Sequence, residues 1–366
     1  MSSPPSRPSR HGLIGRHVRA EAAVPNDAPT TRTLHGGVVT TTPTAATRAI
    51  TPGGVKGAGF FDRMFHDLPP FEASDDDLAA LADAMKDPDP TDPALDNPHV
   101  PAGFTYLGQF VDHDISLDLM PLSGKVEDPT MIENFRTPGL DLDCLYGAGP
   151  GPHRFLFRQD GPKFLIGTAA ASPGPGGSQI PALPNDLERT RHGVPLIGDH
   201  RNDENLVVAQ THLAFLKFHN KVVDHLAAQG TPAPALFDAA ATQVRWHYQW
   251  LVLHDFVERI TQPGIVASIL QSGRKFYRFK TVPFMPVEFA GAAYRLGHSM
   301  VREEYSYNRA FRPFEPRLFA GSLEQLFRFS SLSGEINGQL PGGSDTLPSN
   351  WVIDWRRWFD FDTPAS

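Results

Sequence analysis

Two long stretches of this chain carry apolar residues at helical spacing, and they limit the possible folds more than any other feature of the sequence. The first stretch, residues 204–228, has apolar side chains at intervals of seven and three, which places them on one helix face: Leu206, Leu213, Leu216, Val223 and Leu226. The second stretch, residues 235–268, predicts a long helix broken at Pro263-Gly264, and residues 289–301 predict a third helix. We therefore expect a mainly α-helical protein with long loops and little sheet.

The 366 residues are enough for one large domain or two ordinary ones. Residues 1–57 are rich in Pro, Thr, Arg and Ser and have no amphipathic period, which predicts a flexible arm. Residues 58–366 are predicted to form the folded domain. Ser74, followed by three aspartates and an apolar run, has the pattern of a capped helix start.

Composition excludes several classes of protein. The net charge of −8 argues against nucleic-acid binding, which needs a basic surface. Cys144 is the single cysteine, which excludes an internal disulfide framework and a multi-cysteine metal site. No apolar stretch approaches the roughly 18 to 20 residues of a membrane helix, and residues 1–25 lack the apolar core of a signal peptide. We expect a cytoplasmic or non-classically secreted protein without a membrane span.

Residues 108–114 hold a dense group of side chains that can act in catalysis or ligand binding. If the segment is helical, Gln109, Asp112 and His113 share one face, and Asp114 lies about 100° further round. One turn can then present an imidazole, a carboxylate and an amide to one cavity. The alternatives are a strand and a surface turn with solvated charges.

Two further segments carry candidate site residues. Arg201 and Glu204 are three residues apart before the 204–228 helix, although acids at that place can also cap the helix. Arg295 and His298 lie in the 289–301 stretch, where Gly297 leaves room beside the imidazole for a flat cofactor. A lone histidine on an apolar helix is otherwise a packing residue, and we interpret the histidines at 212, 219, 225, 247 and 254 in that way.

The loop of residues 137–147 alternates oxygen-bearing side chains around Gly139, which permits a tight bend. Such a set of donors suits a hard cation such as calcium. The loop does not match the twelve-residue EF-hand pattern, and the alternative interpretation is a polar turn.

Together these four segments, in their order along the chain across about residues 57–366, resemble the animal-type haem peroxidases of the peroxidase–cyclooxygenase superfamily. The resemblance implies a helical haem peroxidase domain in which Gln109 and His113 line the distal side of haem b. It implies that Arg201 is the distal cation, that Arg295 lies beside the haem and that His298 is the iron ligand. His113 would move a proton of the peroxide while Arg201 stabilises developing charge.

The resemblance also implies a calcium site and haem links. The expected calcium ligands are five: Asp114, Thr137, Gly139 through its carbonyl, Asp141 and Asp143. Asp112 and Glu204 match the two carboxylates that form esters with haem methyl groups. Asn205 stands where the mammalian haloperoxidase has methionine, so at most two ester links and no sulfonium link are expected.

The implied activity is reduction of hydrogen peroxide with oxidation of a small organic or halide donor. Two alternatives are a fatty-acid dioxygenase, which would use a tyrosine such as Tyr294 near His298, and a haem-binding or adhesion module without turnover. The chain departs from the family at Gly139 and Asp143, where an aromatic residue and a serine are usual. We find no match to the family's later asparagine, which hydrogen-bonds the proximal histidine, and expect a domain truncated at its C-terminal end.

Overall fold

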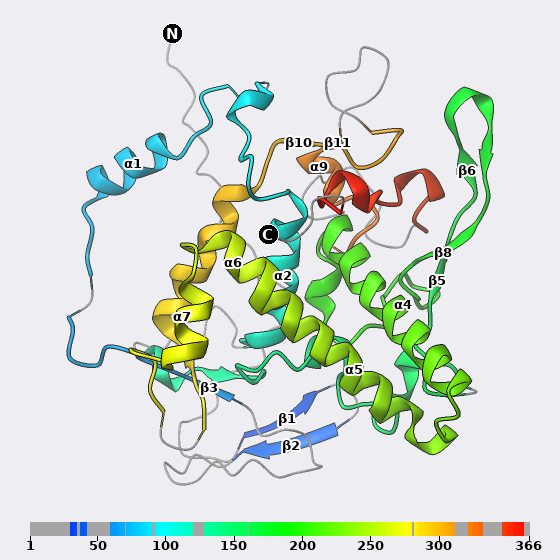
Figure 1. Ribbon diagram of the computed structural model, residues 1–366, viewed down its shortest axis with the longest axis horizontal. Coiled ribbons are helices and arrows are strands. Elements are labelled where there is room, and N and C mark those ends of the chain that lie inside the picture. The colour runs from blue at the N-terminus through cyan, green and yellow to red at the C-terminus, as the bar shows by residue number, and fades with distance from the viewer. Residues whose placement is uncertain are drawn as a thin grey trace.

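The structure is a computed structural model that describes residues 30–34, 37–41, 59–69, 71–89, 92–119, 128–159, 161–279, 282–311, 321–331 and 346–361. The predicted mainly helical fold is confirmed, since helices form the body and the strands are short (Figure 1). The α-helices are α1 (Asp75–Ala84), α2 (Gly103–Ile115), α3 (Asp143–Tyr146), α4 (Leu206–Ala228), α5 (Leu236–Leu251), α6 (Val257–Ile260), α7 (Ile265–Ser272), α8 (Val287–Gly291) and α9 (Leu323–Leu326).

The strands pair into small sheets. A three-stranded sheet has β3 in the centre, antiparallel to β4 and parallel to β9, and the other strands form two-stranded antiparallel pairs. The strands are β1 (Thr30–Leu34), β2 (Gly37–Thr41), β3 (Gly59–Asp62), β4 (Glu133–Asn134), β5 (Gly167–Ala169), β6 (Ser172–Pro173), β7 (Gln179–Ile180), β8 (Leu183–Asp186), β9 (Met285–Pro286), β10 (Glu304–Tyr305) and β11 (Gly321–Ser322). The hairpin of β1 and β2 lies within the predicted arm, most of which is outside the described residues.

The core lies where α4 packs against α5 and α2 (Figure 1). All five apolar residues that predicted the first long helix are buried in α4, so that prediction is confirmed. The second stretch is also helical, with α5 followed by a π-helical turn (Val252–Phe256) and α6. The chain then breaks before α7, where Gly264 has φ 84°. The predicted break at Pro263-Gly264 is therefore confirmed.

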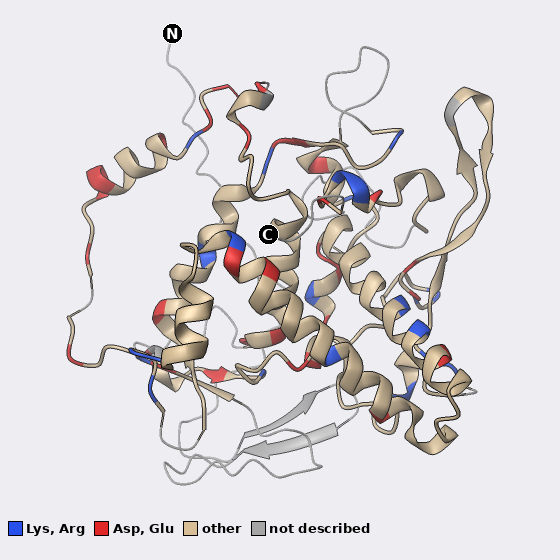
Figure 2. Cartoon of the chain, viewed as in Figure 1, with Lys and Arg blue, Asp and Glu red and all other residues tan. Residues whose placement is uncertain are grey.

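Helix α1 stands apart from the other helices at the left of Figure 1, and none of its residues is buried. Its start agrees with the sequence, because the Ser74 hydroxyl oxygen accepts a hydrogen bond from the Asp77 amide. Acidic residues fill its first turn, which Figure 2 shows in red, and they complement the positive end of the helix dipole. No helix among the described residues is both long and apolar enough to cross a membrane.

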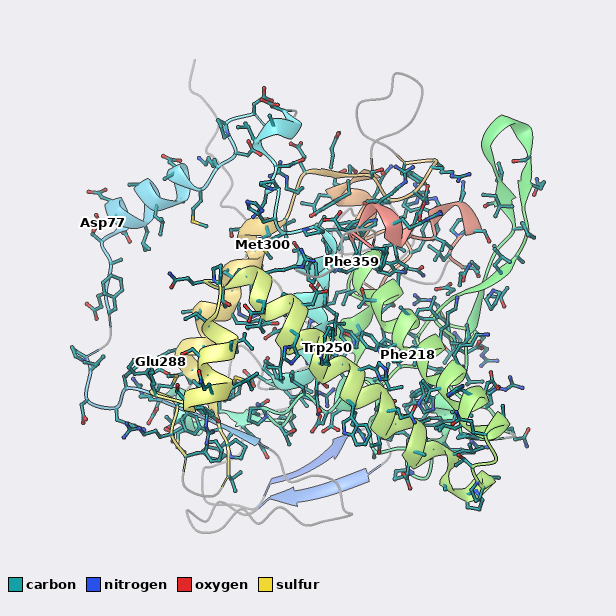
Figure 3. The ribbon with its side chains drawn as sticks, viewed as in Figure 1. Asp77, Phe218, Trp250, Glu288, Met300 and Phe359 are labelled. Carbon is teal, nitrogen blue, oxygen red and sulfur yellow. The ribbon has the colours of Figure 1, made fainter. Side chains whose placement is uncertain are left out.

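Two contacts set the position of the elements that carry the candidate site. The Gly103 amide at the start of α2 donates to the Trp358 carbonyl, and a side chain at Gly103 would collide with Phe359 at 2.5 Å. Phe359, labelled in Figure 3, also packs edge-on against Phe104 of α2.

Glu288 of α8, labelled in the same figure, accepts hydrogen bonds from the Met64 and Phe65 amides. The C-terminal segment thus fixes α2, and the chain after β3 fixes α8.

Candidate functional site

Helix α2 carries the first group of predicted site residues into the core. Apart from Gln109, every residue of the helix is buried, because its apolar residues pack against α4, α5 and the C-terminal segment. His113 is 4% exposed and Asp114 is fully buried. The segment is a buried helix, so the strand and the solvated surface turn are both wrong, because tertiary packing covers the whole helix.

The imidazole of His113 is held by one hydrogen bond. Its Nδ1 lies 2.8 Å from the Asn202 Oδ1, and its Nε2 lies 4.0 Å from the Glu204 Oε2. Burial is the main cause that lowers the pKa of His113 to about 4, and the charge of Arg201 acts in the same direction. The ring is therefore neutral at pH 7, and one of its nitrogens carries a lone pair.

Gln109, Glu204 and Asn205 form a hydrogen-bonded group next to that ring. The Gln109 amide nitrogen donates to the Glu204 Oε2 at 3.3 Å, and the Asn205 amide nitrogen donates to the Gln109 Oε1 at 2.9 Å. Asn205 also caps α4, because its Oδ1 accepts from the Val208 amide. Burial raises the pKa of Glu204 to about 7, against the opposing effect of Arg201. In the sequence, Asn205 stood out only because it replaces the methionine of the mammalian haloperoxidase. In the structure it orients Gln109.

Arg201 lies on the 3₁₀ turn η5 (His200–Asp203), between Asp199 and the end of α2. Its guanidinium donates twice to the Asp199 carboxylate, at 2.8 and 3.0 Å, and once to the His113 carbonyl at 2.9 Å. Arg136 donates to the same carboxylate at 2.6 Å. Burial would raise the pKa of Asp199, but the two arginines hold it well below its usual range. Two guanidiniums on one carboxylate give these three side chains together a net positive charge, next to the His113 backbone carbonyl to which both arginines donate.

The stretch that carries His298 departs from the prediction of a single helix. Helix α8 ends at Gly291, Ala292 has non-helical backbone angles, and residues Ala293–Met300 form a 3₁₀ helix, η8, with no buried residue. The predicted apolar helix over 289–301 is therefore wrong in type and in burial. We attribute the loss of the α-helix to Gly291 and Gly297, because each glycine disfavours an α-helix by about 1 kcal/mol relative to alanine.

His298 nevertheless has the features that iron ligation needs. Its Nδ1 hydrogen-bonds to the Arg295 carbonyl at 3.1 Å, and no described residue hydrogen-bonds to its Nε2. The side chain is exposed, and a Cβ placed on Gly297 would meet no atom within 4 Å. An imidazole with Nδ1 engaged and open space beside it suits a proximal haem ligand. The Nδ1 partner of His298 is thus a backbone carbonyl of the same 3₁₀ helix and not an asparagine.

Two hydrogen bonds join η8 directly to α2. The Tyr294 hydroxyl donates to the Gly108 carbonyl at 2.9 Å, and the Arg295 guanidinium lies 3.2 Å from the Asp112 carboxylate. The other Asp112 oxygen accepts from the Ser116 hydroxyl. Asp112 therefore shares α2 with His113 and pairs with the segment that carries His298. A cleft of about 250 Å³ lies elsewhere, between residues 97–102 and 356–360, and includes none of these residues.

The predicted calcium ligands meet next to Asp114. Its carboxylate accepts hydrogen bonds from the Leu142 amide at 3.1 Å and the Cys144 amide at 3.4 Å. Burial raises the pKa of Asp114 to about 7, and the charges of Asp141 and Asp143 act in the same direction. The Thr137 hydroxyl donates to Asp141 at 2.7 Å.

Leu142 lies between Asp141 and Asp143 in the chain. It has φ 59°, a conformation that residues other than glycine rarely adopt. A Cβ on Gly139 would lie 3.6 Å from the Thr137 hydroxyl and 3.7 Å from the Asp141 carboxylate, so Gly139 borders the same oxygens. Among the described residues, no three His, Cys, Asp or Glu side chains are already arranged around a common point. The loop and Asp114 are brought together, and calcium binding stays a prediction.

Sequence reasoning missed three side chains of the His113 group. Asn202 and Arg136 each contact His113, and the Asn202 amide nitrogen lies 3.0 Å from the His212 Nδ1. The expectation that His212 only packs is therefore incomplete, although the ring also lies edge-on to Phe110. A polar histidine inside the strongly apolar stretch of α4 was the one available signal.

Comparison with known proteins agrees with this geometry. The sequence pattern of the animal haem peroxidase family matches residues 122–320, which is more than half of the chain. A peroxidase-like protein of Margaritifera margaritifera is 26% identical over 252 residues, which cover 54% of this chain and 31% of that protein. This chain thus spans about a third of the length of that relative.

Two solved structures are similar at low sequence identity. A variant of fatty acid alpha-dioxygenase from Oryza sativa with palmitic acid has a TM-score of 0.50 at 16% identity, over 75% of this chain and 52% of that one. Peroxidase A from Dictyostelium discoideum has a TM-score of 0.48 at 15% identity, over 75% of this chain and 62% of that one. The family's sequence pattern, and the helical site that the structure places within and beside it, lead to one conclusion: the chain belongs to the animal haem peroxidase family.

Proposed function

We propose that this protein is a haem-dependent peroxidase that reduces hydrogen peroxide and oxidises a small organic or halide donor. One observation carries the proposal. A buried, neutral His113, with a net positive charge beside it, lies on a helix that is hydrogen-bonded to the segment bearing His298. Members of this family typically bind haem, and the two histidines have the environments that the two sides of a haem require.

The residues would divide the work of holding haem b. His298 would bind the iron through Nε2, because its Nδ1 is already engaged by the Arg295 carbonyl. Asp112 and Glu204, both largely buried, would lie at the haem edge and could each form an ester, which removes the charge of a buried carboxylate. When bound, haem supplies the iron and the electrons that break the oxygen–oxygen bond of the peroxide.

The distal residues would handle the proton and the charge. The lone pair of His113 takes a proton from the bound peroxide and returns it to the leaving oxygen, which departs as water. Arg201, held by Asp199, stabilises the negative charge that develops on that oxygen. Gln109, fixed between Glu204 and Asn205, orients a water molecule or a halide. The two electrons that reduce the peroxide come finally from the donor.

The first test is the absorption spectrum of the purified full chain with haem, followed by donor oxidation. We expect a ferric haem spectrum that changes on addition of hydrogen peroxide and returns when a phenolic donor or iodide is oxidised. A haem spectrum that peroxide does not change would contradict the peroxidase and would favour a haem-binding module without turnover.

A fatty-acid dioxygenase is the second candidate, and two observations favour it. The structure resembles a rice alpha-dioxygenase with a TM-score of 0.50, and Tyr294 is hydrogen-bonded to α2 beside the proposed haem site. Oxygen uptake with a long-chain fatty acid such as palmitic acid would distinguish the two activities. If uptake exceeds donor oxidation and is lost in Tyr294→Phe, the dioxygenase is correct and the peroxidase is not.

We also propose a calcium ion bound by Asp114, Thr137, Gly139, Asp141 and Asp143. Three carboxylates with a hydroxyl and a carbonyl favour a hard cation, and a cation would offset the burial and the repulsion by Asp141 and Asp143 that raise the pKa of Asp114. We expect about one calcium per chain, by metal analysis of the desalted protein. Removal by EGTA should lower the melting temperature, since a ligand at about 100 times its Kd stabilises by about 2.7 kcal/mol.

The Asp114→Asn variant provides the test of location, because it removes the buried ligand and keeps the shape of the side chain. Its melting temperature should no longer respond to EGTA, whereas Asp224→Asn on the exposed face of α4 should respond as the unmodified chain does. A chain without calcium whose stability EGTA does not change would refute the site.

A further inference from the structure

The proposed distal histidine, His113, is the first of three buried polar side chains that are hydrogen-bonded in a row. The Nδ1 of His113 lies 2.8 Å from the Asn202 Oδ1, and the Asn202 Nδ2 lies 3.0 Å from the Nδ1 of His212. His113 is 4% exposed, and Asn202 and His212 are fully buried. Asn202 therefore joins two histidines that are 99 positions apart, out of contact with water.

The chemistry of an amide determines which atoms carry hydrogen in this row. An amide oxygen only accepts a hydrogen bond and an amide nitrogen only donates, so the Nδ1 of His113 must carry a proton and the Nδ1 of His212 must not. A neutral imidazole has one N–H, and the Nε2 of His113 is then the atom with the lone pair. That atom faces Glu204 and Gln109 rather than the protein interior behind the ring.

We propose that Asn202 is a positioning residue, which holds the ring of His113 with its proton on Nδ1 so that Nε2 can take a proton from peroxide. His212 orients Asn202 by accepting from its amide nitrogen. The consequence for peroxide rests on the proposed function, but the arrangement of hydrogen atoms does not. In the reaction, Nε2 gains the peroxide proton while the Nδ1 proton stays on the ring, hydrogen-bonded to the Asn202 Oδ1, and Nε2 then gives its proton to the leaving oxygen.

The turn η5 makes this arrangement rigid. Arg201 and Asn202 are neighbours on the turn, and they grip His113 at two points, the backbone carbonyl and the ring. The turn itself is anchored by Asp203, which accepts two hydrogen bonds of 2.7 Å from Arg189. Ring and backbone of His113 are thereby fixed from one short segment.

His212 shows that the row has a role beyond filling space. Its Nε2 is buried, and among the described residues it has no hydrogen-bond partner. An unpaired buried polar group destabilises a protein, and a phenylalanine would fill such a site without that loss. An arrangement that tolerates this loss is expected where the other ring nitrogen is needed, here to orient Asn202.

Nuclear magnetic resonance of the full chain, labelled with ¹³C and ¹⁵N in histidine and loaded with diamagnetic zinc protoporphyrin, tests the proposal directly. The nitrogen shifts distinguish the two neutral forms of each ring, and loss of signals in His113→Gln and His212→Gln assigns them. We expect a protonated Nδ1 in His113 and a protonated Nε2 in His212. A protonated Nε2 in His113 would overturn the proposal.

The Asn202→Leu variant tests the cause, because leucine has a similar size and makes no hydrogen bonds. We expect His113 to shift toward the form protonated on Nε2, whose nearest acceptor is then Glu204 at 4.0 Å. Reaction with peroxide should slow by about 10- to 100-fold with an unchanged ferric spectrum, the usual effect of removing the partner of a functional histidine. Asn97→Leu, the same change at an exposed asparagine, should alter neither measurement.

The outcomes separate this proposal from the proposed function. An unchanged His113 form in Asn202→Leu would refute the positioning role. If the form changes as expected but the unmodified chain never reacts with peroxide, the positioning of the ring stands and the peroxidase is refuted.

Discussion

Replacing His298 by alanine is expected to abolish the ferric haem spectrum of this protein. The Nε2 of His298 has no hydrogen-bond partner among the described residues, its Nδ1 is engaged by the Arg295 carbonyl, and the side chain is exposed. Because an exposed side chain contributes little to packing, the substitution should change the free energy of unfolding by no more than about 0.5 kcal/mol. Loss of the spectrum therefore reports loss of the ligand and not loss of the fold.

A matched control is available in α5. His247 is also exposed, and its Nδ1 also hydrogen-bonds to a backbone carbonyl of its own helix, that of Gln243. The His247→Ala variant should keep the haem spectrum. Added imidazole should restore part of the spectrum in His298→Ala by occupying the vacated position. If His298→Ala binds haem with an unchanged spectrum, the iron ligand is another residue.

Covalent links would change how the same experiment is read. If Asp112 and Glu204 form esters, peroxide-treated protein will keep haem in acidic butanone, and His298→Ala will retain a haem with an altered spectrum. Extraction of the unmodified chain after peroxide exposure therefore belongs in the experiment. Haem that extracts freely would show that these carboxylates are not linked to it, and it would leave the assignment of His298 intact.

The second large effect is expected at His113, where substitution should slow the reaction with peroxide and leave haem bound. Removal of a general acid–base group typically lowers a rate by about 10²- to 10⁴-fold. We prefer His113→Gln to His113→Ala, because the glutamine amide can still donate to Asn202 and leaves less of a cavity in the core. Stopped-flow absorption after mixing with peroxide gives the rate constant.

His219→Gln is the control for that experiment. His219 lies on α4 and is buried, as His113 is on α2. Its hydrogen bonds go to the Tyr146 hydroxyl and the Pro162 carbonyl, away from Arg201 and Glu204. The control should react at the normal rate if it folds. A normal rate in His113→Gln would show that a different group moves the proton, and Glu204 would be the next candidate because burial raises its pKa to about 7.

The sequence alone determined the helices that build the site and most of the residues in it. The spacing of Leu206, Leu213 and Leu216 identified α4, because helical periodicity records which face of a helix is buried. That Gln109 and His113 share a face followed from helix geometry only if their segment is helical, and the sequence left a helix and a strand both open. Periodicity carries no information on short irregular helices, so the 3₁₀ form of η8 and the exposure of His298 were not foreseen.

Only the tertiary structure decided which polar groups meet. Asn202 is far in sequence from His113 and only ten residues before His212, and its side chain bonds to both because η5 packs between α2 and α4. Likewise, Arg201 is committed to Asp199 and the His113 carbonyl, and Asn205 to Gln109. The reason is physical: most buried polar groups are hydrogen-bonded, and the partner of each is set by how helices pack across the chain, which local sequence does not encode.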